Sequence, residues 1–323
     1  MTRPRLLVTR RLPEPVERQL AQRYETTLNP ADTPLTRAEL IEAMARHDAI
    51  LPTITDRFDA GVLGAPHARV RILANYGAGF EHIDLDAARA AGIAVTNTPD
   101  VLTDATAELA ILLMLMAARR AGEGERELRA GGWTGWRPSH LIGRTIHGKR
   151  LGLIGFGRIA QATARIARDG FGMTIFYASR RRAPEDVERA LGATWVGSLG
   201  ELASSVDILS LHTPGGPATA HLVDAALLAR MAPHAIVVNT ARGSVIDEAA
   251  LADALASGRI AAAGLDVYER EPAVEPRLGA LDNVVLLPHL GSATIEARTA
   301  MGMRAAANLE AFFDGRDPPD RLA

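Results

Sequence analysis

The sequence predicts an α/β fold with two parallel β-sheets, and three observations support this. The chain has 323 residues, about twice the size of a common single domain, so two hydrophobic cores are expected. Short apolar runs alternate with helix-like stretches, which is typical of parallel strands joined by helices. The alternation occurs in two series, residues 5–95 and residues 151–288, and each series predicts one sheet.

The first series occupies the N-terminal third of the chain. Residues 36–39 have the spacing of a capping box and predict the start of a helix. Pro99 ends the series, because the residue before a proline avoids the helical conformation, and a long helix is expected over 103–120. Residues 122–148 have no clean period and predict a loop or a partner-contacting excursion. The expected strands are 6–8, 49–51, 71–74 and 93–95.

The second series and one further helix account for the rest. A long helix is expected over 293–313, ended by Asp314-Gly315. The expected strands are 151–154, 173–177, 208–211, 235–239 and 284–287.

Composition excludes several classes of protein. The 36 basic and 38 acidic residues give a net charge of −2, so no basic field attracts nucleic acid. No cysteine is present, which excludes disulfides and thiolate metal sites and favours a cytoplasmic location. The longest apolar run, 109–118, is too short for a bilayer, which needs about 20 residues. No clustered metal ligands are found, and no metal is expected.

A glycine-rich turn predicts a cofactor site. The apolar run 151–154 leads into Gly155-Phe156-Gly157-Arg158-Ile159-Ala160 and a helix. Gly155 permits a tight turn, Gly157 lets the backbone approach a pyrophosphate, and Ala160 allows close helix packing. The N–H groups at the helix N-terminus favour a phosphate. This context predicts a Rossmann dinucleotide site, with a turn that binds no ligand as the alternative.

The end of the second strand in this series indicates which dinucleotide binds. NAD sites usually carry Asp or Glu there, to bind the ribose hydroxyls. This strand ends in Ser179-Arg180-Arg181-Arg182, and guanidinium groups bind a 2′-phosphate that a carboxylate would repel. We therefore expect NADP(H) to be preferred over NAD(H), with the three arginines around one 2′-phosphate. A solvated basic turn is the alternative.

Three polar residues follow apolar strands in the last third of the chain, where open α/β sheets bind ligands. They are Arg242, Glu271 and His289. Arginine can bind carboxylate and keto oxygens together, and histidinium can donate a proton while hydride arrives. A carboxylate can stabilise that imidazolium. These residue types fit the reduction of a 2-keto acid.

At this point the sequence resembles the D-isomer-specific 2-hydroxyacid dehydrogenase family over nearly its whole length. The motifs that carry the resemblance occur in the expected order: residues 75–84, 102–108, the glycine loop, 211–214, 239–243, 266–272 and 288–292. The resemblance implies two doubly wound parallel-sheet domains. A Rossmann cofactor domain, 99–290, is inserted in a discontinuous flavodoxin-like substrate domain, 1–98 and 291–323, with the active site between the two series.

The resemblance also implies roles for individual residues. Arg242, Glu271 and His289 form the catalytic set, the N–H groups of Ala78 and Gly79 bind the substrate carboxylate, and Leu51 and Tyr76 line the substrate pocket. Asp266 is expected to face the nicotinamide carboxamide. The other expected cofactor-binding residues are Thr106, Gly155, Phe156, Gly157, Arg158, Ile159, Ser179, Arg180, Arg181, His212, Thr213, Pro214, Thr240, Ala241, His289 and Gly291.

Within the family, the Ser-Arg ending and residues 133–138 look most like glyoxylate/hydroxypyruvate reductases that use NADPH. The resemblance implies reduction of glyoxylate or hydroxypyruvate to glycolate or D-glycerate by a homodimer, in which Trp133 and Trp136 mark the subunit contact. The alternatives are that the two tryptophans form a wall of the substrate pocket reached across the dimer, or that this segment packs on its own chain. Two other functions stay open: a corepressor-like protein that senses NAD(P), and a dehydrogenase for a bulkier D-2-hydroxy acid.

Overall fold

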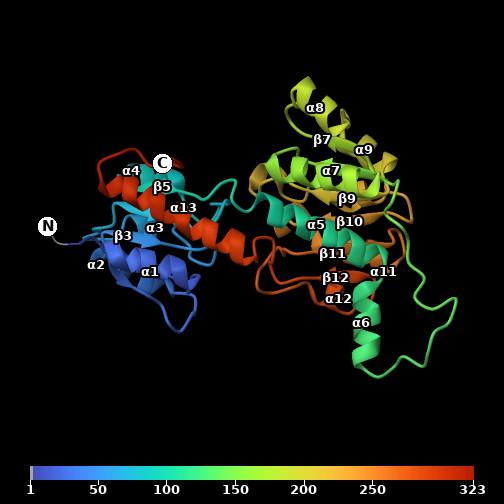
Figure 1. Ribbon diagram of the computed structural model, residues 1–323, viewed down its shortest axis with the longest axis horizontal. Helices are drawn as coiled ribbons and strands as arrows, with labels where there is room; N and C mark the ends of the chain where they lie inside the picture. Colours follow the sequence, from blue (N-terminus) through green and yellow to red (C-terminus); the bar gives the residue numbers. More distant parts are fainter. Residues whose placement is uncertain (1–2) are drawn as a thin grey trace. The chain divides into compact units, whose positions relative to one another are not determined.

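The computed structural model describes residues 3–323. The chain folds into two compact units (Figure 1). Unit 1 comprises the chain up to Leu102 together with Ser292–Ala323, and unit 2 comprises Thr103–Gly291. Unit 2 is therefore inserted between the two segments of unit 1.

Unit 1 contains a 5-stranded sheet with the order β2-β1-β3-β4-β5, in which every neighbouring pair is parallel. This is the flavodoxin-like strand order, as expected. The strands are β1 (Arg5–Val8), β2 (Glu25–Thr27), β3 (Ala49–Leu51), β4 (Ile72–Ala74) and β5 (Ala94–Thr96).

Helices cover both faces of this sheet because its strand residues are apolar on both sides. Leu6, Val8 and Leu51 pack with α1 (Glu14–Arg23) and α13 (Ile295–Phe313). Leu7 and Ile50 point to the other face. That face is covered by α2 (Arg37–Arg46), α3 (Ala60–Leu63) and α4 (Leu85–Ala90). The predicted capping box is present at the start of α2, where Thr36 and Glu39 bond reciprocally.

Unit 2 contains a 7-stranded parallel sheet with the order β12-β11-β10-β9-β6-β7-β8. Counted from the first strand of the unit, this is the Rossmann order extended by one strand. The predicted fold class is therefore confirmed. The strands are β6 (Arg150–Ile154), β7 (Thr174–Ala178), β8 (Ala193–Trp195), β9 (Ile208–Leu211), β10 (Ile236–Asn239), β11 (Ala262–Leu265) and β12 (Val284–Leu286).

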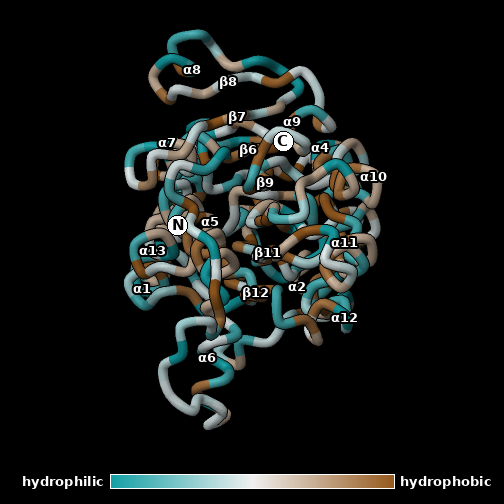
Figure 2. Tube along the Cα trace, turned by 90° about the vertical axis from the view of Figure 1, so that its right-hand side faces the viewer, coloured by the Kyte–Doolittle hydropathy of each residue, from teal (hydrophilic) through white to brown (hydrophobic). Residues whose placement is uncertain are grey.

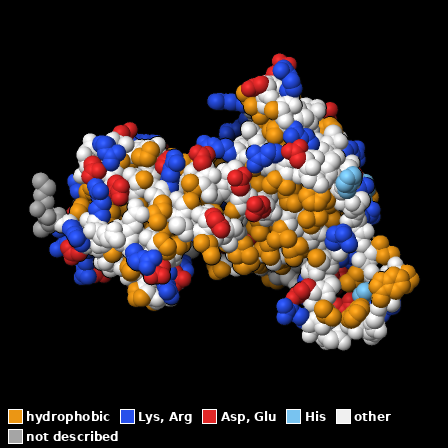
Figure 3. All heavy atoms as spheres, viewed as in Figure 1, with side chains coloured by type: hydrophobic (Ala, Val, Ile, Leu, Met, Phe, Trp, Pro, Cys, Tyr) orange, Lys and Arg blue, Asp and Glu red, His pale blue; other side chains and the backbone are white. Residues whose placement is uncertain are grey.

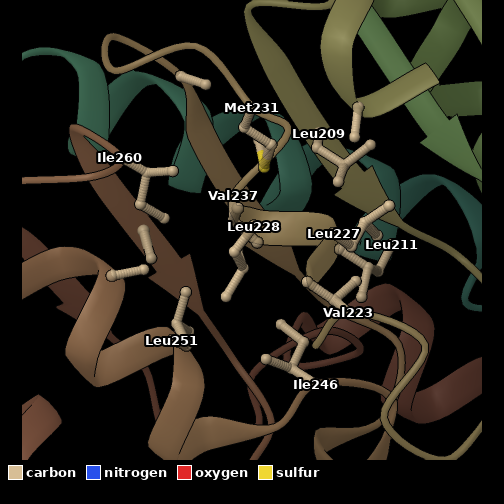
Figure 4. Close-up of a cluster of buried hydrophobic side chains, with 14 of the residues drawn as sticks. Leu209, Leu211, Val223, Leu227, Leu228, Met231, Val237, Ile246, Leu251 and Ile260 are labelled. Atoms are coloured by element: carbon tan, nitrogen blue, oxygen red, sulfur yellow. The ribbon is translucent and has the colours of Figure 1, made fainter. Parts of the chain in front are cut away.

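Two hydrophobic cores lie on the two faces of this sheet, and Figure 2 shows hydrophobic residues in brown along its strands. One face is covered by α5 (Thr103–Ala118), α7 (Arg158–Phe171) and α8 (Glu185–Leu191). The other is covered by α9 (Leu199–Ser205), α10 (Ala225–Leu228), α11 (Glu248–Ala256) and α12 (Pro276–Gly279). Figure 4 shows this second core, where Leu209, Val237 and Leu251 meet.

The structure corrects one expectation about the segment after α5. Residues 122–148 were expected to lack regular structure, but helix α6 (Ala121–Arg129) occupies its start. No residue of α6 is buried, so the helix packs no apolar face on a core of its own unit. Ion pairs one turn apart stabilise the helix instead, such as that between Arg120 and Glu123.

Among residues 3–323, no helix is both long enough and apolar enough to cross a membrane.

Candidate functional site

The glycine loop after β6 is shaped by two backbone requirements. Gly155 has a φ of +87°, in the left-handed region, and a Cβ there would lie 2.5 Å from the carbonyl oxygen of His212. Only glycine meets both conditions. A Cβ at Gly157 would meet no atom within 4 Å, and no side chain caps the start of α7. The start of α7 thus offers backbone N–H groups that can donate to a phosphate.

A cavity of about 900 Å³ opens at this loop. It is lined by Phe156 of the glycine loop, by Ser179, Arg180 and Arg181 after β7, and by His212, Thr213 and Pro214 after β9. The lining includes seven of the expected cofactor residues beside the two glycines and does not include Arg158 or Ile159, which begin α7.

The expectation that three arginines gather at this cavity is wrong for Arg182. Its Nε and Nη2 donate to the two carboxylate oxygens of Glu188, at 2.9 and 2.8 Å, and it does not line the cavity. The guanidinium groups of Arg180 and Arg181 bond to no group within residues 3–323. Two free cations therefore face the cavity, and the third forms an ion pair behind it.

His212 is unsuited to proton donation. It is half-buried and shares a hydrogen bond with Ser210 at 2.9 Å. Burial lowers the pKa of His212 to about 4, so the ring is neutral near pH 7. This agrees with its expected place in the wall of the cofactor cavity.

His289 and Glu271 form a hydrogen-bonded pair, with 2.8 Å between Nδ1 of His289 and Oε2 of Glu271. The other carboxylate oxygen of Glu271 accepts the N–H of Tyr268 at 3.0 Å. Burial raises the pKa of Glu271, but the bond and charge of His289, the Tyr268 N–H and the charge of Arg242 together lower it below its usual value. Glu271 is thus ionised beside the imidazole.

Asp266 holds the backbone around His289. Its two carboxylate oxygens accept the N–H groups of Leu290 at 2.6 Å and of Gly291 at 2.8 Å, and its carbonyl accepts the N–H of His289. His289 itself has a φ of 54°, which is uncommon for a residue other than glycine. Thr106 donates to the Gly291 carbonyl at 3.1 Å. Asp266 and Thr106 therefore fix the loop that carries the histidine.

Arg242 lies in the loop after β10, beside the loop that carries Glu271. Asn239 shapes the first loop by donating to the Arg242 carbonyl at 2.9 Å and accepting the N–H of Ala241 at 3.0 Å. A Cβ at Gly243 would lie 1.8 Å from the carbonyl carbon of Tyr268. The two loops therefore pack backbone against backbone, which places Arg242 near Glu271. The hydrogen bond between Glu271 and His289 joins the loop after β12 to them.

The residues expected to bind substrate in unit 1 surround the end of β4. Leu51 is fully buried in the core, and the hydroxyl of the buried Tyr76 donates to the Arg298 carbonyl at 2.6 Å. Ala78 and Gly79 are partly exposed, and their N–H groups make no hydrogen bond within residues 3–323.

Two asparagines orient these N–H groups. Asn75 donates to the carbonyls of Gly77 and Gly79, at 3.1 and 2.8 Å, and Asn97 donates to the carbonyl of Ala78 at 2.8 Å. In a trans peptide, the N–H points away from the preceding carbonyl. The N–H groups of Ala78 and Gly79 are thus turned away from the asparagines. Sequence reasoning missed this role, although both asparagines directly follow buried strands, as the catalytic candidates do.

The residues of unit 2 fit a dinucleotide. A Cβ at Gly157 would project into open space at the cavity, which leaves room for a phosphate beside the N-terminus of α7. The hydroxyl of Thr240, beside Arg242, is buried and has no partner within residues 3–323. Both features provide contacts that a bound cofactor can use. No cluster of potential metal ligands occurs in the described part of the chain.

Comparisons with known proteins agree with this geometry. Residues 111–291 match the model of the NAD-binding domain of the D-isomer-specific 2-hydroxyacid dehydrogenases. The chain is 43% identical over 321 residues to a glyoxylate reductase of Thermococcus onnurineus, covering 98% of this chain and 95% of that protein.

Two solved structures are similar along their whole length. The crystal structure of a Polaromonas protein assigned to the same family has a TM-score of 0.94 and 38% identity, with 99% of this chain and 100% of that one covered. An NADPH-dependent glyoxylate/hydroxypyruvate reductase of Sinorhizobium meliloti, in complex with NADP and malonate, has a TM-score of 0.87 and 36% identity, with 100% and 97% covered. The chain therefore belongs to the D-isomer-specific 2-hydroxyacid dehydrogenase family.

Proposed function

We propose that this enzyme reduces a small 2-keto acid, glyoxylate or hydroxypyruvate, to the D-2-hydroxy acid with NADPH. The observation that carries the proposal is the pairing of His289 with an ionised Glu271, beside Arg242, at the strand ends of a dinucleotide-binding sheet. The names of the relatives support the substrate class, since they include glyoxylate reductases and an NADPH-dependent glyoxylate/hydroxypyruvate reductase.

Each residue has a chemical task in this reaction. A bound reduced nicotinamide supplies the hydride that reaches C2 of the keto acid. His289 donates a proton to the C2 oxygen as negative charge develops there, and Glu271 stabilises the imidazolium before the transfer. Arg242 binds the substrate carboxylate and the C2 oxygen. The N–H groups of Ala78 and Gly79 bind a substrate carboxylate as an anion nest.

The preference for NADPH rests on the wall of the cavity formed by Ser179, Arg180 and Arg181. The guanidinium groups of Arg180 and Arg181, which bond to no other group within residues 3–323, favour a 2′-phosphate, and the residues that line this wall include no carboxylate. Thr240, Ala241, Asp266 and Gly291 are proposed to lie along the nicotinamide half of the cofactor, where the buried Thr240 hydroxyl is available as a donor.

We also propose a homodimer formed through α6 and the segment that follows it. Four large apolar side chains of this part of the chain are exposed, and Figure 3 shows hydrophobic side chains gathered there. They are Leu128, Trp133, Trp136 and Ile142, and Trp136 is 82% exposed. A surface of this kind is typical of a subunit contact.

One assay tests the proposed reaction. NADPH oxidation is measured with glyoxylate, hydroxypyruvate and the bulkier phenylpyruvate, and then with NADH in place of NADPH. We expect turnover with the two small acids and a higher kcat/KM with NADPH. His289→Ala should lower kcat by about 1000-fold, the usual contribution of a general acid, and leave the Kd for NADPH unchanged.

His147→Ala is the matched control, because His147 is an exposed histidine of unit 2 and lies outside the proposed site. Absence of turnover with every keto acid would contradict the proposed reductase activity and favour the alternative of a protein that senses the nucleotide. A preference for phenylpyruvate would indicate a dehydrogenase for bulkier substrates.

A further inference from the structure

A hydrogen-bonded network with a buried centre lies beside the cavity wall that carries Arg180 and Arg181. Its centre is Glu188 of α8, which is only 7% exposed. One carboxylate oxygen accepts the hydroxyl of Tyr177 at 2.5 Å and Nε of Arg182 at 2.9 Å, and the other accepts Nη2 of Arg182 at 2.8 Å. The ion pair is bidentate, the geometry that fixes a guanidinium most firmly.

Tyr177 connects this network to both sides of the cavity. Its hydroxyl accepts the N–H of Ala183 at 2.9 Å, so the far end of the loop 179–184 is held to the end of β7. Its ring stacks on Phe156 in the glycine loop, with 3.9 Å between ring centroids and 17° between planes. One side chain thus links the glycine loop, the arginine loop and α8.

Arg182 differs from the other residues of the loop 179–184 in its position relative to the cavity. Ser179, Arg180, Arg181, Ala183 and Pro184 line the cavity, and Arg182 does not. Arg182 also lies over the ring of Trp195, 5.9 Å from its centroid. Because Arg182 is held on the far side, its neighbours in the loop face the cavity.

The charges of the network balance. Arg182 and Tyr177 lower the pKa of Glu188 to about 2, so Glu188 is ionised at neutral pH and cancels the charge of Arg182. The positive charge that remains at the cavity belongs to Arg180 and Arg181.

We propose that Tyr177, Arg182 and Glu188 are positioning residues for the adenosine 2′-phosphate. They do not touch it; they hold the loop 179–184 so that Arg180 and Arg181 face the cavity, and in this way they set the discrimination between NADPH and NADH. The inference rests on the NADPH preference in the proposed function.

Simple electrostatics gives the opposite expectation. Replacing Glu188 by alanine removes a negative charge near the cavity and frees a third arginine, so charge alone predicts tighter binding of a 2′-phosphate. Positioning predicts weaker binding, because the freed loop has to be ordered again at each binding event. The sign of the change in affinity for the 2′-phosphate therefore distinguishes a positioning role from an effect of charge alone.

The experiment measures binding to the full chain by calorimetry, with 2′,5′-ADP and 5′-AMP as probes for the adenosine halves of NADPH and NADH. We expect Glu188→Ala to weaken binding of 2′,5′-ADP on the order of tenfold, as for residues coupled in one network, and to leave 5′-AMP binding unchanged. Tyr177→Phe keeps the ring stacking and should give the same selective loss. The double variant Glu188→Ala/Tyr177→Phe should lose no more affinity for 2′,5′-ADP than the single variant with the larger loss.

Glu185→Ala is the matched control, since Glu185 lies on the same helix, is exposed and, within residues 3–323, forms no hydrogen bond with Tyr177 or Ala183; it accepts one from Arg189. It should leave both affinities unchanged. If Glu188→Ala weakens binding of both probes, the result for Tyr177→Phe decides. A selective loss of 2′,5′-ADP binding in that variant supports the positioning role, and no selective loss overturns it. If the wild-type chain prefers 2′,5′-ADP and both variants keep or strengthen that preference, the positioning role is overturned and the NADPH proposal stands. If the wild-type chain shows no preference, the NADPH proposal itself is overturned.

Discussion

His289 is held from two directions. Glu271 bonds its side chain and Asp266 bonds its backbone, and the residue adopts a left-handed φ of 54° that few side chains accept. Such a conformation persists only where surrounding contacts over-determine it. A histidine that is oriented before substrate binds spends no free energy on ordering its ring during the reaction.

Asn75 provides a test of the anion nest. Asn75→Ala removes two donors to the carbonyls of Gly77 and Gly79, each worth about 1 kcal/mol, and leaves the N–H groups of Ala78 and Gly79 less well oriented. Steady-state kinetics should show a KM for the keto acid raised by about tenfold, with an unchanged Kd for NADPH.

Asn29→Ala is the control for this variant. Asn29 makes a similar pair of bonds in the same unit, to the carbonyls of Thr9 and Thr33. Its replacement should leave the KM unchanged. An equal rise in KM for both variants, or none for Asn75→Ala, would exclude the orienting role.

At the scale of single residues, the sequence indicates which residues follow a strand, but it does not indicate which side chains pair with one another. Arg242, Glu271 and His289 could be singled out because each follows an apolar strand, a pattern that is local in the chain. The pairing of Arg182 with Glu188 could not, because it depends on where α8 packs after the loop turns. The expected cluster of three arginines was wrong for this reason.

At the scale of elements, the loops after β10 and β11 are packed directly against each other. Gly243 allows them to touch, because even a methyl group would lie 1.8 Å from the Tyr268 carbonyl carbon. Gly243→Ala should push the two loops apart, because close-packed neighbours cannot shift far enough to accommodate the added methyl group. A displacement of about 1 Å costs about 100-fold in rate, so kcat/KM should fall by at least about that factor.

Gly170→Ala serves as the comparison, since a Cβ at this position in α7 would meet nothing within 4 Å. It should keep its activity and gain a little in thermal stability. Wild-type kinetics for Gly243→Ala would show that the loops do not need this contact.

The elements also differ in how well sequence predicts them. Most inner strands were predicted because they are apolar throughout. The inner strand β11 was not among the expected strands, although all four of its residues are buried; they are two alanines, a glycine and a leucine. Edge strands β2 and β8 were not predicted either, since most of their residues are exposed. Helix α6 was missed because ion pairs and not burial stabilise it.

For the whole molecule, the two parallel sheets follow from the alternation of strands and helices, and their doubly wound arrangement was expected from the family resemblance. The assembly of the protein depends on surface residues, which the hydrophobic pattern of the sequence does not reveal. The homodimer therefore stays a proposal, as does the cytoplasmic location predicted from the composition.

Sedimentation tests the homodimer. At micromolar concentration, the wild-type chain should sediment at twice the 34.4 kDa of one chain. Trp133→Ser/Trp136→Ser should shift it toward the single chain, because it removes two exposed indoles. Ile295→Ser is the control, since Ile295 is also 82% exposed but belongs to unit 1. A wild-type chain that sediments singly would contradict the dimer.

The order of the two units along the chain sets the order in which they can fold during synthesis. Unit 2 is continuous, so it can fold as soon as its own residues leave the ribosome. Unit 1 lacks α13 until residues 295–313 have been made, and the apolar sheet face around Leu6, Val8 and Leu51 is not covered by that helix before then. Ribosomes add about 5–20 residues per second, so residues 103–291 impose a delay of about 10 to 40 seconds. During that interval the nascent first segment is a natural client for chaperones.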